Sequence, residues 1–109
     1  MKNINIGKEP VDSYVMMIEE KDGTVSSYGI LEYESEEGVT VVRILTAERE
    51  LGIEAEQSFI DDKFPGYKVI KKSLLTVSIG DRSVKCDCLR ISNEKEEKDI
   101  YFEISEFSE

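Results

Sequence analysis

Cys86 and Cys88 are the only cysteines in the 109-residue sequence, and they stand on either side of Asp87. On an extended strand these two side chains share a face and run parallel, and their Cα atoms lie roughly 6.6 Å apart, near the upper limit for a disulfide. A metal site would need further soft ligands, and the sequence contains no other cysteine and no histidine. We therefore expect two free thiols buried in a strand, with redox or metal chemistry as the alternative.

The missing histidine also limits the catalytic chemistry that the chain could perform. It removes the commonest general base, the Ser–His and Cys–His nucleophile pairs, and imidazole as a zinc ligand. The seven glycines form no phosphate-binding motif. Carboxylate pairs are frequent, but 24 acidic residues make such pairs expected by chance. We therefore predict that the protein is not an enzyme and that it has no catalytic residues, no metal site and no cofactor.

The charge of the sequence is large and unevenly distributed. The net charge is −10; residues 1–62 contain 15 acids and 5 bases, whereas residues 63–90 contain 2 acids and 7 bases. An acidic surface repels phosphates and anionic lipids and attracts basic protein surfaces. The basic stretch has few aromatic residues for base stacking. We therefore predict a basic protein as the partner, and neither nucleic acid nor a membrane; the alternative is that the acids only confer solubility.

The acidic residues are concentrated around 32–37 and in a helix predicted over 48–63. An exposed tyrosine among acids is typical of protein contacts, so Tyr33 belongs to the same candidate surface. The candidate partner-binding residues are Glu32, Tyr33, Glu34, Glu36, Glu37, Glu48, Glu50, Glu54, Glu56, Asp61 and Asp62. We expect a non-enzymatic binding module, such as an inhibitor, an immunity-type protein, a chaperone or an adaptor. The alternative is a small-molecule or lipid-binding sensor domain with an apolar pocket between sheet and helix.

The elements that position these residues follow from the spacing of the apolar side chains. Alternation with a period of two predicts strands near 13–20, 25–33, 39–45, 67–79, 82–91 and 100–104, with a further short strand at 4–6. The stretch 67–79 is either one long strand or two strands, 67–75 and 76–79, that break near Ser73. Ala55, Phe59, Ile60 and Phe64 recur at helical spacing and predict the helix, which Pro65 ends. Short connections favour antiparallel neighbours. We therefore predict one α+β domain over residues 1–109, with about six antiparallel strands in the order β-β-β-α-β-β-β and one main helix packed on the sheet.

The same spacing predicts which side chains form the core. The expected core residues are Val15, Met17, Leu31, Val41, Leu45, Phe59, Ile60, Val69, Val77, Val84, Cys86, Ile100, Phe102 and Ile104. The order of helix, Pro65-Gly66, hairpin and final aromatic strand over residues 53–104 is loosely similar to the Mog1/PsbP-like sandwich. That resemblance implies one candidate for the fold and no functional residue.

The sequence also suggests a location and an oligomeric state. Its first residues have no apolar segment of the kind found in signal peptides. Free thiols without a disulfide framework suit a reducing compartment. We therefore expect a cytoplasmic protein, unless a leader segment has been removed. A homodimer that forms through an exposed edge strand is compatible with the strand-rich pattern.

Overall fold

The computed structural model describes residues 2–4, 6, 9–35, 38–46, 48–79 and 82–104. These residues form a mixed seven-stranded sheet and one helix, with the strand order β1-β5-β6-β7-β4-β3-β2. The elements are β1 (Lys2–Ile4), β2 (Asp12–Glu19), β3 (Val25–Glu34), β4 (Thr40–Leu45), α1 (Arg49–Lys63), β5 (Lys68–Ile79), β6 (Arg82–Ser92) and β7 (Glu97–Glu103).

The α+β class and the order of the elements are confirmed. Six longer strands match the prediction, and the short N-terminal strand adds a seventh at the sheet edge. Most pairings are antiparallel, but β1 with β5 and β4 with β7 are parallel. Short connections favour antiparallel pairing only between strands that follow each other directly in the chain. A parallel pair needs a crossover, and α1, β5 and β6 separate β4 from β7.

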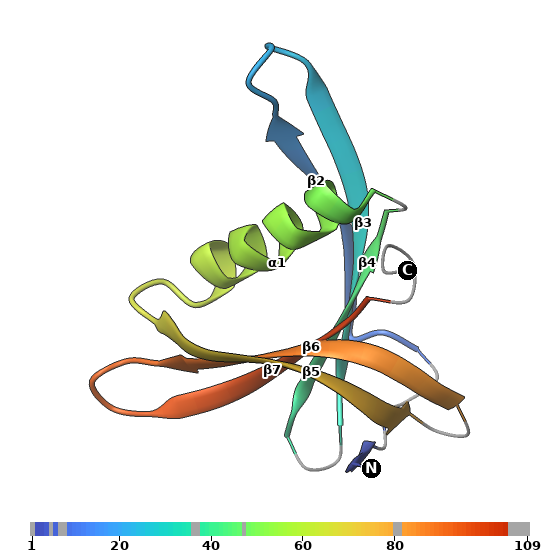
Figure 1. Ribbon diagram of the computed structural model, residues 1–109, viewed down its shortest axis with the longest axis vertical. Coiled ribbons are helices and arrows are strands. Elements are labelled where there is room, and N and C mark those ends of the chain that lie inside the picture. Colours follow the sequence, from blue (N-terminus) through green and yellow to red (C-terminus); the bar gives the residue numbers. More distant parts are fainter. Residues whose placement is uncertain are drawn as a thin grey trace.

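The sheet is strongly twisted, and α1 occupies one side of it. Figure 1 shows β2, β3 and β4 running along the long axis of the molecule, while β5, β6 and β7 run across it. The helix lies in the angle between these two halves. Its buried residues are Leu51, Gly52, Ala55, Glu56, Phe59 and Ile60, which recur three and four positions apart and so form one stripe.

The main core lies between this stripe and the sheet. Phe102 of β7 is fully buried there, and its ring meets Phe59 of α1 edge-on, with centroids 5.6 Å apart. Tyr28 and Ile30 of β3 and Val42 of β4 belong to the same cluster. Because β7 lies between β6 and β4 in the strand order, Phe102 packs at the centre of the sheet.

A second, smaller core lies on the other face of the sheet. It contains Cys86, Cys88 and Tyr101, together with four smaller aliphatic residues of β1, β4, β5 and β6. Ile6 packs against this cluster and forms an isolated bridge to Ser35, just after β3. The bridge brings the chain after β1 to the end of β3 and helps to cover this face. The sheet is therefore partly covered on both sides, as one helix alone could not achieve.

The predicted core is correct in its centre and wrong near the sheet edges. Burial is confirmed for Val41, Phe59, Ile60, Val77, Val84, Cys86, Ile100, Phe102 and Ile104. Four residues expected in the core are exposed instead: Val15 (68%), Met17 (70%), Leu45 (41%) and Val69 (37%), while Leu31 is partly exposed. In β2 the alternate set, Tyr14, Met16 and Ile18, packs against the main core. Both sets are apolar, so alternation alone cannot tell which one faces the helix.

The helix begins one residue later than predicted and ends as predicted. Glu48 is the N-cap residue, and its side chain makes no capping hydrogen bond. Its backbone N–H instead donates to the Thr46 hydroxyl, 3.2 Å away. After the helix, Gly66 adopts a φ of +88°, which favours glycine and turns the chain into β5. In the described part of the chain, no helix has the length and apolar character needed to cross a membrane.

Candidate functional site

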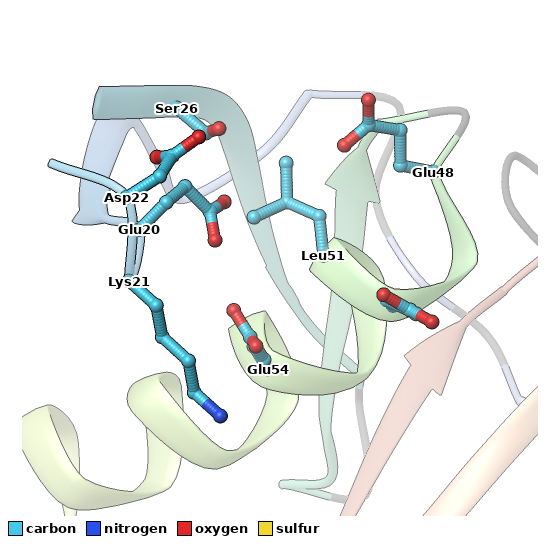
Figure 2. A pocket seen from close by; sticks show the side chains of 8 residues that line it. Glu20, Lys21, Asp22, Ser26, Glu48, Leu51 and Glu54 are labelled. Carbon is cyan, nitrogen blue, oxygen red and sulfur yellow. The ribbon is translucent and has the colours of Figure 1, made fainter. Parts of the chain in front are cut away.

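An acidic cleft of about 590 Å³ lies between the tip of the β2–β3 hairpin and the N-terminal half of α1. Its lining residues are Glu20, Lys21, Asp22, Ser26, Glu48, Glu50, Leu51 and Glu54. Figure 2 shows Glu20 and Asp22 on the hairpin side, with Leu51 and Glu54 on the helix side. Five carboxylates and one ammonium group give the lining a formal charge of −4.

Local hydrogen bonds fix the hairpin side of the cleft. The Glu20 N–H donates to the Thr24 carbonyl at 2.7 Å, and the Gly23 N–H donates to the Glu20 carbonyl at 3.0 Å. Asp22 accepts from the Thr24 hydroxyl at 2.7 Å and from the Thr24 N–H at 3.0 Å. The hydroxyl hydrogen bond, followed by the backbone one, lowers the pKa of Asp22. Its carboxylate therefore stays charged in the lining of the cleft at neutral pH.

The start of α1 forms the opposite wall. Leu51 is buried against the sheet and anchors the first turn, so the neighbouring Glu50 and the Glu54 one turn later remain exposed. Carboxylates near a helix N-terminus interact favourably with the helix dipole. Leu51 is the single large apolar side chain among the lining residues that the structure describes. The cleft thus offers several separated carboxylates to a cationic group and little apolar area to a lipid or drug-like ligand.

The structure places three of the eleven candidate residues in the cleft: Glu48, Glu50 and Glu54. Glu20 and Asp22 were not among the predicted site residues, because residue 20 ends a predicted strand and residues 21–24 only connect it to the next one. The order of the hairpins could have indicated them. β4 runs antiparallel to β3 and ends at Leu45, opposite Gly29, so the chain enters α1 while it runs toward the end of β3 that holds the β2–β3 turn.

The candidate residues of β3 lie elsewhere. Glu32 is close to Tyr14, and its carboxylate is 3.7 Å from the Lys63 ammonium at the C-terminal end of α1. Burial, followed by the interaction with Glu32, raises the pKa of Tyr14. Tyr33 packs against the second core on the other face of the sheet. Glu34 is exposed at the end of β3 opposite the hairpin turn, while Glu36 and Glu37 lie outside the described residues.

The remaining candidates lie farther along α1. Asp61 is exposed and accepts a hydrogen bond from the Gln57 side chain at 3.0 Å, and Asp62 is exposed in the last turn. Glu56 was expected on the outward face, and that expectation is wrong. It is only 2% exposed, because its place in the stripe of buried helix residues turns it toward the sheet.

Glu56 forms a buried acidic pair with Asp87 of β6. The Lys72 ammonium of β5 lies 4.0 Å from the Glu56 carboxyl and 3.8 Å from the Asp87 carboxylate. Burial, followed by the interaction with Asp87, raises the pKa of Glu56 to about 9, and Lys72 opposes this only in part. Glu56 is therefore protonated at neutral pH. Within the described residues, no group of three or more acidic, cysteine or histidine side chains is arranged to hold a metal ion.

Both cysteines are buried free thiols, as expected from their spacing. Cys86 belongs to the second core and is fully buried, whereas Cys88 is 9% exposed. Burial raises the pKa of the Cys86 thiol to about 12, so almost no thiolate is present at neutral pH.

We expect Cys86 to resist alkylation in the folded protein. With iodoacetamide at pH 8, mass spectrometry of native protein should show no rapid modification of Cys86, whereas both thiols should react once guanidinium chloride unfolds the chain. The unfolded sample controls for reagent activity. Rapid native modification of Cys86, or a disulfide between the two cysteines, would contradict this burial.

No family model, no curated protein and no solved structure matches the chain. The similarity to a Mog1/PsbP-like sandwich therefore stays a prediction from the sequence pattern.

Proposed function

We propose that this protein is a non-enzymatic binding module that recognises a basic segment of another protein in the acidic cleft. The observation that carries the proposal is the convergence of five carboxylates from two separate elements around one cleft of about 590 Å³. Inhibitors, immunity-type proteins, chaperones and adaptors are the kinds of protein that act through such surfaces. A reducing, cytoplasmic location suits its free thiols.

The cleft favours lysine and arginine side chains for electrostatic reasons. Carboxylates at the rim of an interface accelerate encounter with a cationic partner, and their effect weakens as salt shortens the Debye length from about 10 Å at 0.1 M to about 3 Å at 1 M. Among the described residues of the lining, Lys21 is the one cation, and it comes from the hairpin side. A partner with several basic residues can therefore contact the carboxylates of the helix and those of the hairpin together.

Other ligand classes find less support. A sensor domain would need an apolar pocket between sheet and helix, whereas the cleft in that place is lined almost entirely by polar residues. Nucleic acid and anionic membranes would be repelled by a lining with a formal charge of −4. Self-association through a sheet edge is compatible with the proposal, because none of the described lining residues belongs to β1, β2 or β5.

We expect reversal of the cleft charge to weaken binding of a basic peptide strongly. Changing Glu20, Glu50 and Glu54 to lysine adds six charge units and takes the lining from −4 to +2. At low salt, the affinity for a nonamer of alternating lysine and arginine should fall by about 10- to 100-fold, since rim charge pairs contribute roughly 0.2–1 kcal/mol each. Isothermal titration calorimetry measures the loss of affinity. In an NMR titration of the wild type, the amide signals that shift when the peptide binds should belong to cleft residues.

A matched variant tests whether net charge alone explains the loss. Glu94, Glu96 and Glu97 are exposed on and beside the β6–β7 loop and do not line the cleft. Their reversal to lysine changes the net charge by the same amount and should retain most of the affinity. Equal losses in the two triple variants would overturn the cleft as the binding site, as would amide shifts spread over the whole acidic surface. The same pair of variants can then be compared in pull-downs at low and high salt.

A further inference from the structure

Two stretches of the sheet have no described strand beside them. β2 ends the strand order, so its outer side is unpaired. At the other end, the short β1 pairs only with Val77, Ser78 and Ile79, which leaves residues 68–76 of β5 without a described neighbour on their outer side. We call these stretches the β2 edge, residues 11–20, and the β5 edge, residues 68–76.

The backbone hydrogen bonds show which residues face outward at the β2 edge. The Glu20 N–H donates to the Thr24 carbonyl across the hairpin. In an antiparallel pair the hydrogen-bonded positions recur every second residue, so even-numbered residues of β2 bond to β3. Odd-numbered residues, among them Val15 and Met17, therefore direct their N–H and carbonyl groups away from the sheet.

The same reasoning applies to the β5 edge. The Ile104 N–H donates to the Lys85 carbonyl, so odd-numbered residues of β6 bond toward β7. Even-numbered residues of β6, such as Cys86, then bond toward β5, where the partner of Cys86 is Leu75. Leu74 lies next to Leu75 and therefore directs its N–H outward, away from β6.

The two edges carry opposite charge. The β2 edge contains three acids, Asp12, Glu19 and Glu20, and no base, whereas the β5 edge contains three lysines and no acid. Like charges placed opposite each other destabilise paired strands, and opposite charges stabilise them. Two β2 edges would thus repel each other, as would two β5 edges, while a β2 edge and a β5 edge attract.

Exposed apolar side chains gather on the same two edges. The described residues include ten large hydrophobic side chains that are exposed, and seven of them lie on these stretches: Val11, Val15 and Met17 on one, and Val69, Ile70, Leu74 and Leu75 on the other. Each edge therefore combines free backbone groups, exposed apolar area and charge of a single sign.

We propose that the β2 edge of one copy pairs with the β5 edge of a second copy, so that their two sheets become continuous. The arrangement is head-to-tail, and each added copy leaves one edge of each kind free unless the contacts close into a ring. Val15 and Leu74 do not line the acidic cleft, so this inference does not depend on the proposed function. A single strand pairing is a small interface, and such interfaces are typical of weak association.

Two proline variants test the proposal. Val15→Pro and Leu74→Pro each remove one outward N–H and leave the ladder to the neighbouring strand intact, and both side chains are more than 60% exposed. Sedimentation velocity up to millimolar protein should show the wild-type mass rising with concentration. Each variant alone should be a monomer, and their mixture should form a heterodimer that stops at two chains. Val15→Thr and Leu74→Thr keep the N–H and should associate like wild type.

A charge swap gives a second test that does not rely on proline. Asp12→Lys with Glu19→Lys makes both edges basic, and Lys68→Glu with Lys71→Glu makes both acidic. Each double variant should be monomeric, and mixing them should restore association, with at least about tenfold weakening between 0.1 and 1 M NaCl.

Three results would overturn head-to-tail pairing. The first is a wild-type protein that remains monomeric at every concentration, and the second is a Leu74→Pro variant that still forms dimers, which indicates pairing of two β2 edges. The third is a mixture of the two charge-swapped variants that does not associate. Circular dichroism of every variant establishes that a monomeric state is a folded one.

Discussion

Glu56→Gln is expected to raise the free energy of unfolding by about 1–3 kcal/mol at pH 7. The stability of the variant should also fall much less steeply than that of the wild type as the pH rises. The pKa of Glu56 is raised from 4.5 to about 9 in the folded protein. Above pH 4.5 the unfolded chain loses this proton, while the folded chain keeps it, so folding must take up a proton. Stability therefore falls by up to about 1.4 kcal/mol per pH unit until the pH reaches the folded pKa.

Glutamine preserves the shape of the side chain and carries no charge to desolvate. Its neutral amide also removes the repulsion between a charged carboxylate at position 56 and Asp87. Urea unfolding at pH 5, 7 and 8.5, followed by circular dichroism because the chain has no tryptophan, measures the free energy of unfolding of both proteins. Glu54→Gln, an exposed glutamate on the same helix, is the matched control and should change stability by less than about 0.5 kcal/mol.

One outcome would contradict this account of the buried pair. If Glu56→Gln destabilises the protein and leaves the pH slope unchanged, then Glu56 is ionised in the folded state and its attraction to Lys72 is stronger than its desolvation. A Lys72→Met variant distinguishes the two cases. Its cost should be the same in the wild type and in Glu56→Gln if Glu56 is protonated, since Lys72 then pairs only with Asp87 in both proteins. The cost should be larger in the wild type if Glu56 is charged, because Lys72 then loses two carboxylate partners there.

Phe102→Ala is expected to lower the free energy of unfolding by about 3–5 kcal/mol, which is the usual cost of removing a fully buried phenylalanine. The ring is completely buried at the centre of the sheet and makes an edge-on contact with Phe59. Its removal leaves a cavity between α1 and β7 and loses that contact. The free energy of unfolding of a protein of this size is roughly 5–15 kcal/mol, so the substitution would remove a large part of it.

The control for this prediction is the same truncation at a less buried ring. Phe64→Ala removes a side chain that is only partly buried at the end of α1, and it should cost about 1 kcal/mol, close to the average for point mutations. Phe102→Leu fills most of the space and provides a measurable variant if the alanine variant is largely unfolded. Equal costs at positions 64 and 102 would contradict the central place of Phe102 in the core.

The sequence predicts the elements well because they depend on local spacing. The period of two located the six longer strands, and the stripe of Ala55, Phe59 and Ile60 located the helix and its buried face. The same stripe contained a signal for Glu56, which precedes Phe59 by three residues and Ile60 by four and so must share their face. Glu56 was nevertheless assigned to the exposed face, because glutamate is usually a surface residue.

Contacts between residues that are far apart in the sequence could not be predicted from local spacing. The partner of Glu56 is Asp87, 31 positions later, and no local pattern connects them. The cleft likewise depends on how α1 packs against the β2–β3 hairpin, which brings Glu20 and Glu54 to one place. For β2, apolar residues on both faces left the choice between Val15 and Met16 to the tertiary structure.

The place of β7 in the sheet determines when this chain can fold. In the strand order β7 joins the β2–β3–β4 meander to the β5–β6 hairpin, and its pairing with β4 connects residues 60 positions apart, such as Thr40 and Ile100. During synthesis the ribosome releases β2, β3 and β4 long before β7. Until β7 emerges, the inner edge of β4 stays open and the apolar face beneath α1 lacks Phe102. The domain therefore completes its fold after nearly all of it has been made, and the early meander is the stage at which a chaperone would protect it.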